Sequence, residues 1–185
     1  MQRLCEDICT RSPRMRHIDM SKVAVSFNQT RKRVRHGMWA SLTPMRFENG
    51  ARETVRGGRR YTAQRLLDKN GEEMKYILSF YLPRFMQLSF SDKMITVFHE
   101  LWHISPDFNG DIRRHPGRCY AHTESEKEYD AQMEVYFHEW LQLGPPTELH
   151  VWLKKKFADL ERAHGCVYGT RIRHPKLIPL DRKAR

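Results

Sequence analysis

The feature that most constrains the fold is an apolar stretch at residues 94–104. It reads MITVFHELWHI, and Glu100 is the only Asp, Glu, Lys or Arg within it. Burying a charged side chain costs free energy unless the charge is paired, hydrogen-bonded or bound to a metal ion. The stretch therefore predicts a buried helix in which Glu100 has a specific partner.

Two histidines flank that glutamate. His99 and His103 are four residues apart, so on a helix they lie on one face. Two imidazoles in this arrangement can bind one Zn²⁺ while the intervening Glu100 reaches a water molecule on the metal. This constellation is typical of enzymes that hydrolyse peptide or related amide bonds. The alternative interpretation is a core helix with two hydrogen-bonded histidines.

A catalytic zinc usually has three protein ligands and one open position, so a third ligand is needed downstream. His122 is favoured, because it precedes Thr123, the expected N-cap of the next helix, and is therefore held rigidly. His115 is the alternative, although Arg113 and Arg114 precede it and would repel a cation. The carboxylates that remain as outside candidates are Asp107, Asp111, Glu124 and Asp130.

The remaining roles follow from the hydrolytic chemistry. Glu100 is expected to act as the general base, taking a proton from the attacking water and later passing one to the leaving amine. A developing oxyanion needs a further stabilising group, for which Tyr120, Tyr129 and Arg118 are equal candidates. Asp111 either belongs to a plain Asn-Gly-Asp turn or orients a ligand imidazole.

The length of 185 residues predicts one domain, at residues 1–164, followed by an extended basic tail at 165–185. The sequence has no run of about 18 apolar residues, so no membrane span is expected. The N-terminus lacks the apolar region of a signal peptide, which favours the cytoplasm. Four cysteines without a CxxC pair are expected to be free thiols: Cys5, Cys9, Cys119 and Cys166.

The formal net charge is +11, and the positive residues are clustered. The clusters are residues 31–36, the three arginines Arg56, Arg59 and Arg60, residues 154–156 on an expected late helix, and the tail from Arg171. Such clusters can neutralise phosphates, so a nucleic acid is a candidate partner. The alternative is that they are solvated faces of a basic protein.

The pattern along the chain predicts an α+β fold. Strands are expected at 23–27, 37–43, 51–56, 59–67 and 74–82, and the turn dipeptides at 49–50, 57–58 and 70–71 would join the last of them into an antiparallel meander. Helices are expected at residues 1–16, from an N-cap at Ser91 to about 104, from Thr123 to about 143, and at 147–164.

These residues resemble a known family. The stretches 23–27, 42–47, 76–85 and 99–129 are similar to metallopeptidases of bacteria and their phages. The most specific segment is HELWHISPDFNGDIRR at 99–114, continuing through 117–123. The resemblance covers about residues 18–140. It implies a small zincin-like α+β fold, a zinc cofactor, and peptidase activity on protein or peptide substrates. The order of strands and then helix predicts that the meander packs against the His-Glu helix.

A looser similarity is to the SprT and Spartan proteases, which act on proteins bound to DNA. Their third histidine also lies beyond a loop and is followed by glycine, whereas here Thr123 follows His122 and Pro116 follows His115. The sequence thus predicts a zinc metallopeptidase with DNA-associated proteins as one substrate class. One alternative is a non-enzymatic nucleic-acid-binding protein whose structural zinc has Cys119 or the second histidine as fourth ligand. Another is a phage-encoded effector that hydrolyses one host protein.

Overall fold

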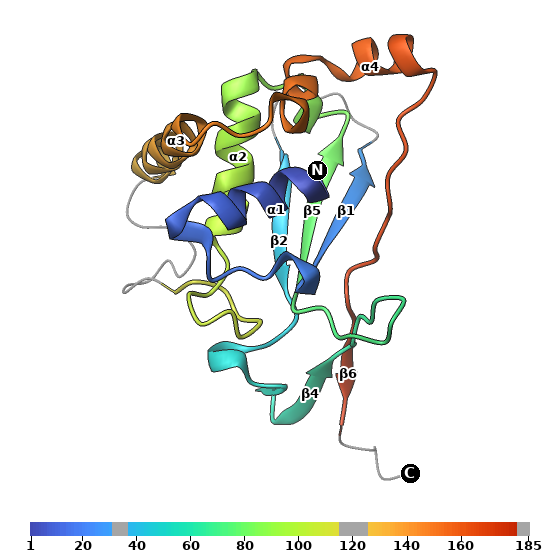
Figure 1. The fold of residues 1–185 in the computed structure, drawn as a ribbon. Coiled ribbons are helices and arrows are strands. Elements are labelled where there is room, and N and C mark those ends of the chain that lie inside the picture. Colours follow the sequence, from blue (N-terminus) through green and yellow to red (C-terminus); the bar gives the residue numbers. More distant parts are fainter. Residues whose placement is uncertain (31–36, 115–125, 181–185) are drawn as a thin grey trace.

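The computed structural model describes residues 1–30, 37–114 and 126–180, and it has an α+β architecture (Figure 1). The helices are α1 (Gln2–Arg11), α2 (Phe90–Trp102), α3 (Glu126–Gln142) and α4 (Phe157–His164). The strands are β1 (Val23–Gln29), β2 (Ala40–Pro44), β3 (Glu53–Arg56), β4 (Arg59–Ala63), β5 (Tyr76–Leu82) and β6 (Leu177–Pro179).

The central sheet is mixed, with the strand order β1-β5-β2. β1 runs parallel to β5, from Val23 opposite Tyr76, and β2 runs antiparallel to β5, with Ala40 opposite Phe80. The expected antiparallel meander is therefore wrong. The first five residues of β5 are all buried, as in a strand covered on both faces, so it occupies the centre of the sheet rather than the end of a meander.

The segment between β2 and β5 forms a second, smaller sheet with the order β3-β4-β6. Only one of the three predicted hairpin turns joins two strands: Gly57 and Gly58 have φ values of 54° and 73° and connect β3 to β4. The Asn49-Gly50 pair lies in a 3₁₀ turn, η3 (Glu48–Gly50), and the Asn70-Gly71 pair turns a loop. This segment is rich in arginine, whose charged side chains are costly to bury. Its strands therefore pair outside the central sheet and do not cover the core.

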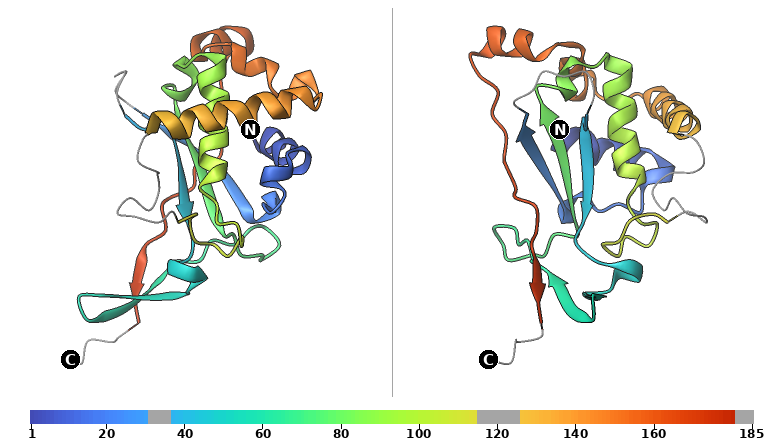
Figure 2. Two further views of the ribbon diagram at one scale, coloured as in Figure 1. Left: turned by 90° about the vertical axis from the view of Figure 1, so that its left-hand side faces the viewer. Right: turned by 180° about the vertical axis from the view of Figure 1, so that it is seen from behind.

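One face of the central sheet is covered by helices (Figures 1 and 2). Alternate residues of β5, namely Tyr76, Leu78 and Phe80, are fully buried in one core cluster with side chains of α1, α2 and α3. Trp140 of α3 is also fully buried, and its Nε1 donates a hydrogen bond of 2.9 Å to Asp7 of α1. These contacts hold α2 between the sheet and α3.

The C-terminal segment runs alongside β1, an edge strand of the central sheet, before it becomes β6 (Figures 1 and 2). Phe27 N donates to Thr170 O at 2.8 Å, and Ile172 N donates to Ser26 Oγ at 2.9 Å. β6 then pairs with β4, with Thr62 opposite Ile178. The segment expected to be an extended tail is thus extended, and it closes the small sheet.

Several helix boundaries differ from the expected ones. The N-cap of α2 is Ser89 rather than Ser91, because Ser89 Oγ accepts the Asp92 amide at 3.0 Å. The expected helix at 147–164 is broken into η5 (Thr147–Leu149), η6 (Val151–Lys154) and α4, so residues 154–156 are not on one helix. The break is stabilised by the buried Lys93, whose Nζ donates to the carbonyl oxygens of Leu153 and Lys155.

Two further expectations concern the cysteines and the membrane. Cys5, Cys9 and Cys166 are free thiols, as predicted, and Cys119 lies outside the described residues. Within the described ranges, no helix combines the length and the apolar character needed to cross a bilayer. Thr123, the expected cap of the helix after the loop, is also outside the described residues, and α3 begins at Glu126.

Candidate metal centre

The last turn of α2 brings the two predicted zinc ligands together. α2 ends at Trp102, and His103 is its C-cap residue, with φ −66° and ψ −16° and its N–H bonded to His99 O at 3.3 Å. The ring centroids of His99 and His103 are 4.7 Å apart. The i, i+4 spacing thus places two imidazoles side by side at one end of the helix.

The orientation of His99 is set by a carboxylate from α3. Asp130 Oδ1 lies 3.0 Å from His99 Nδ1. A carboxylate on one ring nitrogen fixes the tautomer and the ring plane, so a metal ion would bind the other nitrogen, Nε2. From the sequence alone, Asp130 is only an outside candidate for a metal ligand, because no local pattern connects it to His99, which is 31 positions away.

Tyr129 of α3 packs against both histidines. Its ring lies 4.7 Å from that of His99 and is stacked 5.6 Å from that of His103. The side chain is 2% exposed, and burial raises the pKa of its phenol well above the usual value. Tyr129 is therefore a neutral phenol at physiological pH and is the one predicted oxyanion candidate that lies within the described site.

Glu100 is buried between α2 and the central sheet. It is 8% exposed, and burial raises the pKa of its carboxyl group to about 7, while a backbone hydrogen bond from Leu42 of β2 acts in the opposite direction. A carboxyl group with this pKa can gain or lose a proton near neutral pH, which is the property required of a general base. A cation bound nearby would lower this raised pKa, because it stabilises the charged carboxylate.

Asp111 belongs to a rigid loop that follows His103. Its carboxylate accepts hydrogen bonds from Asn49 N at 3.0 Å and Ile112 N at 2.8 Å and pairs with Arg114 at 2.9 Å. The Tyr76 hydroxyl donates to Asp111 O at 2.9 Å and accepts from Gly110 N at 3.0 Å. These contacts favour the turn interpretation of Asp111 over a role in orienting a ligand imidazole. Asp107 is exposed on the same loop.

The predicted third ligand cannot be placed. Six of the predicted site residues lie outside the described residues: His115, Arg118, Cys119, Tyr120, His122 and Glu124. Within the described part of the chain, no group of three or more His, Cys, Asp or Glu side chains is arranged to hold a metal ion. The described donors therefore fit two positions of a zinc site, with a buried carboxyl group beside them, and the third ligand stays a prediction.

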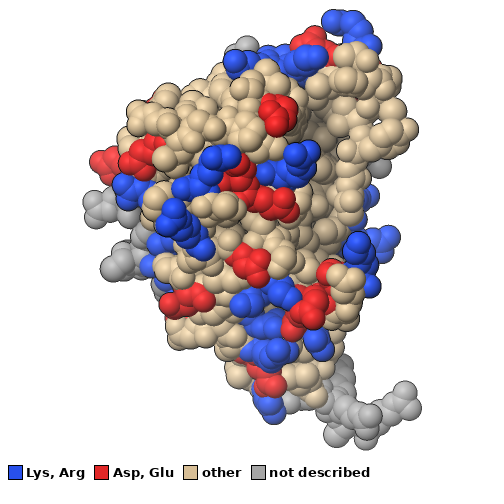
Figure 3. Space-filling view, viewed as in Figure 1, with Lys and Arg blue, Asp and Glu red and all other residues tan. Residues whose placement is uncertain are grey.

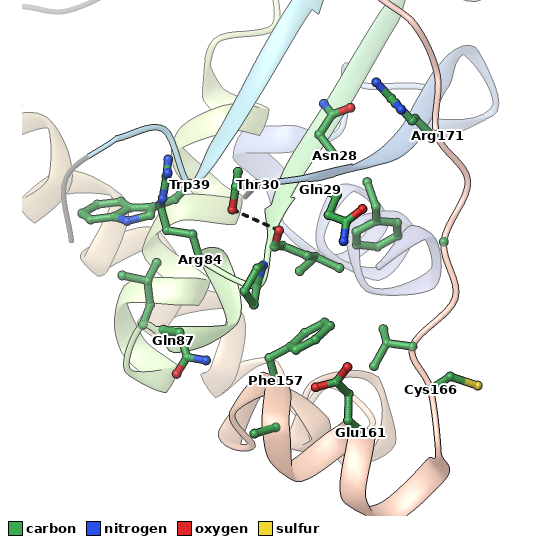
Figure 4. A pocket seen from close by; sticks show the side chains of 17 residues that line it. Asn28, Gln29, Thr30, Trp39, Arg84, Gln87, Phe157, Glu161, Cys166 and Arg171 are labelled. Carbon is green, nitrogen blue, oxygen red and sulfur yellow. Dashed lines mark hydrogen bonds between the residues drawn. The ribbon is translucent and has the colours of Figure 1, made fainter. Parts of the chain in front are cut away.

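A cavity of about 1150 Å³ lies at a different place in the fold. It lies between the end of β1, the end of β5 and α4, and Figure 4 shows Thr30, Arg84, Phe157 and Glu161 around it. Neither the two histidines nor Glu100 lines it. The His-Glu-His group is thus separate from this cavity and lies at the opposite end of α2.

This chain matches a family of known proteins. No curated protein and no solved structure matches this chain. The profile of one family, described as "Putative phage metallopeptidase", matches residues 1–140. The match includes the whole of β1, β2, β5 and α2, the loop after His103, and most of α3. It implies a metal cofactor and activity on protein or peptide substrates. On the extent of this match, the chain belongs to the phage metallopeptidase family.

Proposed function

We propose that this protein is a zinc-dependent peptidase of zincin-like fold whose centre is the last turn of α2. His99 and His103 hold the metal, His122 is the third ligand with His115 as the alternative, and Glu100 is the general base. The observation that carries the proposal is the burial of Glu100, with its pKa raised to about 7, beside two imidazoles 4.7 Å apart.

Each described residue has a distinct task in this proposal. When bound, Zn²⁺ supplies a Lewis acid that makes a water molecule nucleophilic near neutral pH. Glu100 takes the proton from the attacking water and delivers it to the leaving amine. Asp130 holds His99 in one tautomer through the 3.0 Å contact at Nδ1. Tyr129 supports both imidazole rings and excludes solvent from their far side.

The edge of β2 offers a place for the substrate backbone. Among the described strands, β2 has a neighbour on the β5 side alone, where Trp39 O accepts from Tyr81 N and Met45 N donates to Lys75 O. Backbone groups alternate along a strand, so Ala40 and Leu42 direct theirs away from β5. The Leu42 backbone lowers the pKa of the Glu100 carboxyl group, which agrees with this direction. A peptide added to β2 as a strand would therefore lie beside the general base.

The two other hypotheses are a non-enzymatic nucleic-acid-binding protein with a structural zinc and an effector that hydrolyses one host protein. A structural zinc site is closed by four ligands and has no use for a further buried carboxyl group beside them. The position of Glu100 therefore favours catalysis over a non-enzymatic zinc protein. A small hydroxamate distinguishes them, because it inhibits only a centre with an open position. An effector with one host target would share the whole mechanism and differ in its substrate range.

The decisive variant is Glu100→Gln, which keeps the size of the side chain and removes its ability to accept a proton. The matched control is Glu148→Gln, the same change at an exposed position in η5. Zinc-loaded proteins are incubated with a proteome-derived peptide library, and cleavage products are read by mass spectrometry. Glu100→Gln should lower the cleavage rate by roughly 100- to 10,000-fold and leave the zinc content at the wild-type level.

The proposal predicts opposite results for the two variants. Glu148→Gln must cleave at the wild-type rate. Cleavage by Glu100→Gln at the rate of this control would exclude Glu100 as the base. Failure of the purified protein to bind zinc at all would exclude the metal-dependent mechanism itself.

A further inference from the structure

The β3–β4 hairpin has two faces, and one of them carries an arginine pair that the proposed peptidase does not use. Because side chains alternate along a strand, Thr54, Arg56, Arg59 and Tyr61 lie on the same side of the hairpin. We propose that this side, here called the arginine face, binds the phosphate backbone of a nucleic acid. The inference concerns binding alone and does not depend on zinc or on hydrolysis.

The charge of this segment is strongly positive. Residues 52–65 contain five arginines and one glutamate. Three of the arginines have carboxylate partners: Arg60 pairs with Glu53, and Arg52 and Arg65 pair with Glu73. Among the described residues, no ion pair involves Arg56 or Arg59. Within the described part of the chain, these two positive charges are therefore available to an external anion.

The register of the hairpin places these two arginines together. Arg56 and Arg59 are directly opposite each other across the two strands, on either side of Gly57 and Gly58. Like charges at opposed positions destabilise a hairpin by a few tenths of a kcal/mol to about 1 kcal/mol. The tight turn, with positive φ at both glycines, keeps the pair from separating. This arrangement does not favour folding, but it suits recognition of closely spaced negative charges.

The shape of the molecule makes the arginine face accessible. The hairpin projects away from the helices, as the left-hand view of Figure 2 shows. In Figure 3, Lys and Arg gather over the lower part of the molecule, where the small sheet lies, with acidic side chains among them. Tyr61 is half-buried and stands two residues after Arg59 on the same face, where its ring can contact a sugar or a base.

Nucleic acid is favoured over an anionic membrane by the distribution of apolar side chains. A membrane-binding surface needs cations and exposed apolar groups on the same side. The two most exposed apolar side chains of the small sheet, Val55 (66%) and Ile178 (44%), lie on the face opposite to Arg56 and Arg59, and the less exposed Leu177 (40%) lies on the arginine face. A duplex instead presents about one negative charge per 1.7 Å of helix axis and needs no apolar contact.

The hairpin is also connected to the candidate metal centre. η3 precedes β3, and the Asn49 amide donates to Asp111, in the loop that follows His103. A nucleic acid on the arginine face would therefore be held at a constant position relative to α2. If the peptidase proposal is correct, proteins attached to nucleic acid would be concentrated near its site.

The test uses the full chain and a fluorescent duplex of about 20 base pairs, with binding followed by anisotropy between about 50 and 200 mM salt. The test variant is Arg56→Gln with Arg59→Gln. The control is Arg3→Gln with Arg16→Gln, which removes the same charge from two exposed positions near α1. Circular dichroism and thermal melting verify that both variants are folded. Vesicles of phosphatidylglycerol and polyglutamate serve as other anionic probes.

The hairpin variant should bind the duplex roughly 10- to 100-fold more weakly at low salt, and the slope of log K against log salt should fall by about 1 to 2. The control should remain within about threefold of the wild type. An equal loss in both variants would mean that binding follows net charge only and would overturn the proposal. The proposal would also be overturned if the hairpin variant lost binding to vesicles or to polyglutamate and still bound the duplex as the wild type does.

Discussion

The Tyr76 hydroxyl joins the central sheet to the loop that follows His103, and its removal provides a sharp test of the described packing. Tyr76 lies on β5 and is fully buried. Its hydroxyl donates to Asp111 O at 2.9 Å and accepts from Gly110 N at 3.0 Å. The substitution Tyr76→Phe deletes both hydrogen bonds and keeps the ring in place.

The size of the effect follows from burial. An internal hydrogen bond contributes about 1 kcal/mol, and a buried group left without a partner costs about 1–3 kcal/mol. Asp111 O retains a second bond from Ser105 N at 3.3 Å, so the larger penalty applies to the Gly110 amide. Tyr76→Phe should therefore lower the free energy of unfolding by about 2–4 kcal/mol.

A control is available on the same strand. Tyr81 also ends in a hydroxyl, but that group lies 3.4 Å from Ser41 Oγ and is only part-buried. Tyr81→Phe should cost less than about 1 kcal/mol. The free energies of unfolding of both variants and of the wild type are measured by equilibrium unfolding in urea. They are compared under the condition that the m-values agree. If Tyr76→Phe is no less stable than Tyr81→Phe, the loop is not anchored to β5 in the described way.

Two further predictions concern the metal and the pH dependence of stability. Asp130→Ala should weaken zinc binding roughly 10- to 100-fold, as measured by competition with a chelating dye, because His99 loses the carboxylate at Nδ1; an unchanged dissociation constant would show that Asp130 does not orient the ring. Burial lowers the pKa of Lys93 to about 8, so between this value and the unfolded value of about 10.5 the unfolded chain binds more protons and stability rises with pH. The difference in stability between the wild type and Lys93→Met should therefore shift in favour of the wild type by about 1–2 kcal/mol from about pH 7.5 to about pH 9.5. The comparison isolates Lys93, because the buried thiols of Cys5 and Cys9, whose pKa values are raised, are present in both proteins. A difference that does not change over this range would contradict the lowered pKa of Lys93.

Local patterns in the sequence were sufficient for several parts of the fold. The apolar stretch around Glu100 predicted a buried helix, and the i, i+4 histidines are side by side at its end. The Gly57-Gly58 dipeptide predicted a hairpin, and both residues have positive φ there. These predictions succeed because helix faces and tight turns depend on residues only two to four positions apart.

The sheet topology was beyond such patterns. The meander expected between residues 51 and 82 is instead divided between two sheets, and β1 pairs with a strand more than 45 residues away. Parallel pairing has no local turn signal, because its two strands are joined by a long crossover. β6 likewise reaches β4 across more than 110 residues, and no pattern in the basic tail indicated a strand.

The sequence alone determined which side chains share the end of α2 and therefore which chemistry the chain can support. Only the tertiary structure brought Asp130 to His99, buried Glu100 against β2, and placed Arg56 directly opposite Arg59. The physical reason is range: the helix repeat is set by neighbouring residues, whereas a pKa and an ion pair depend on groups that meet only when distant segments pack.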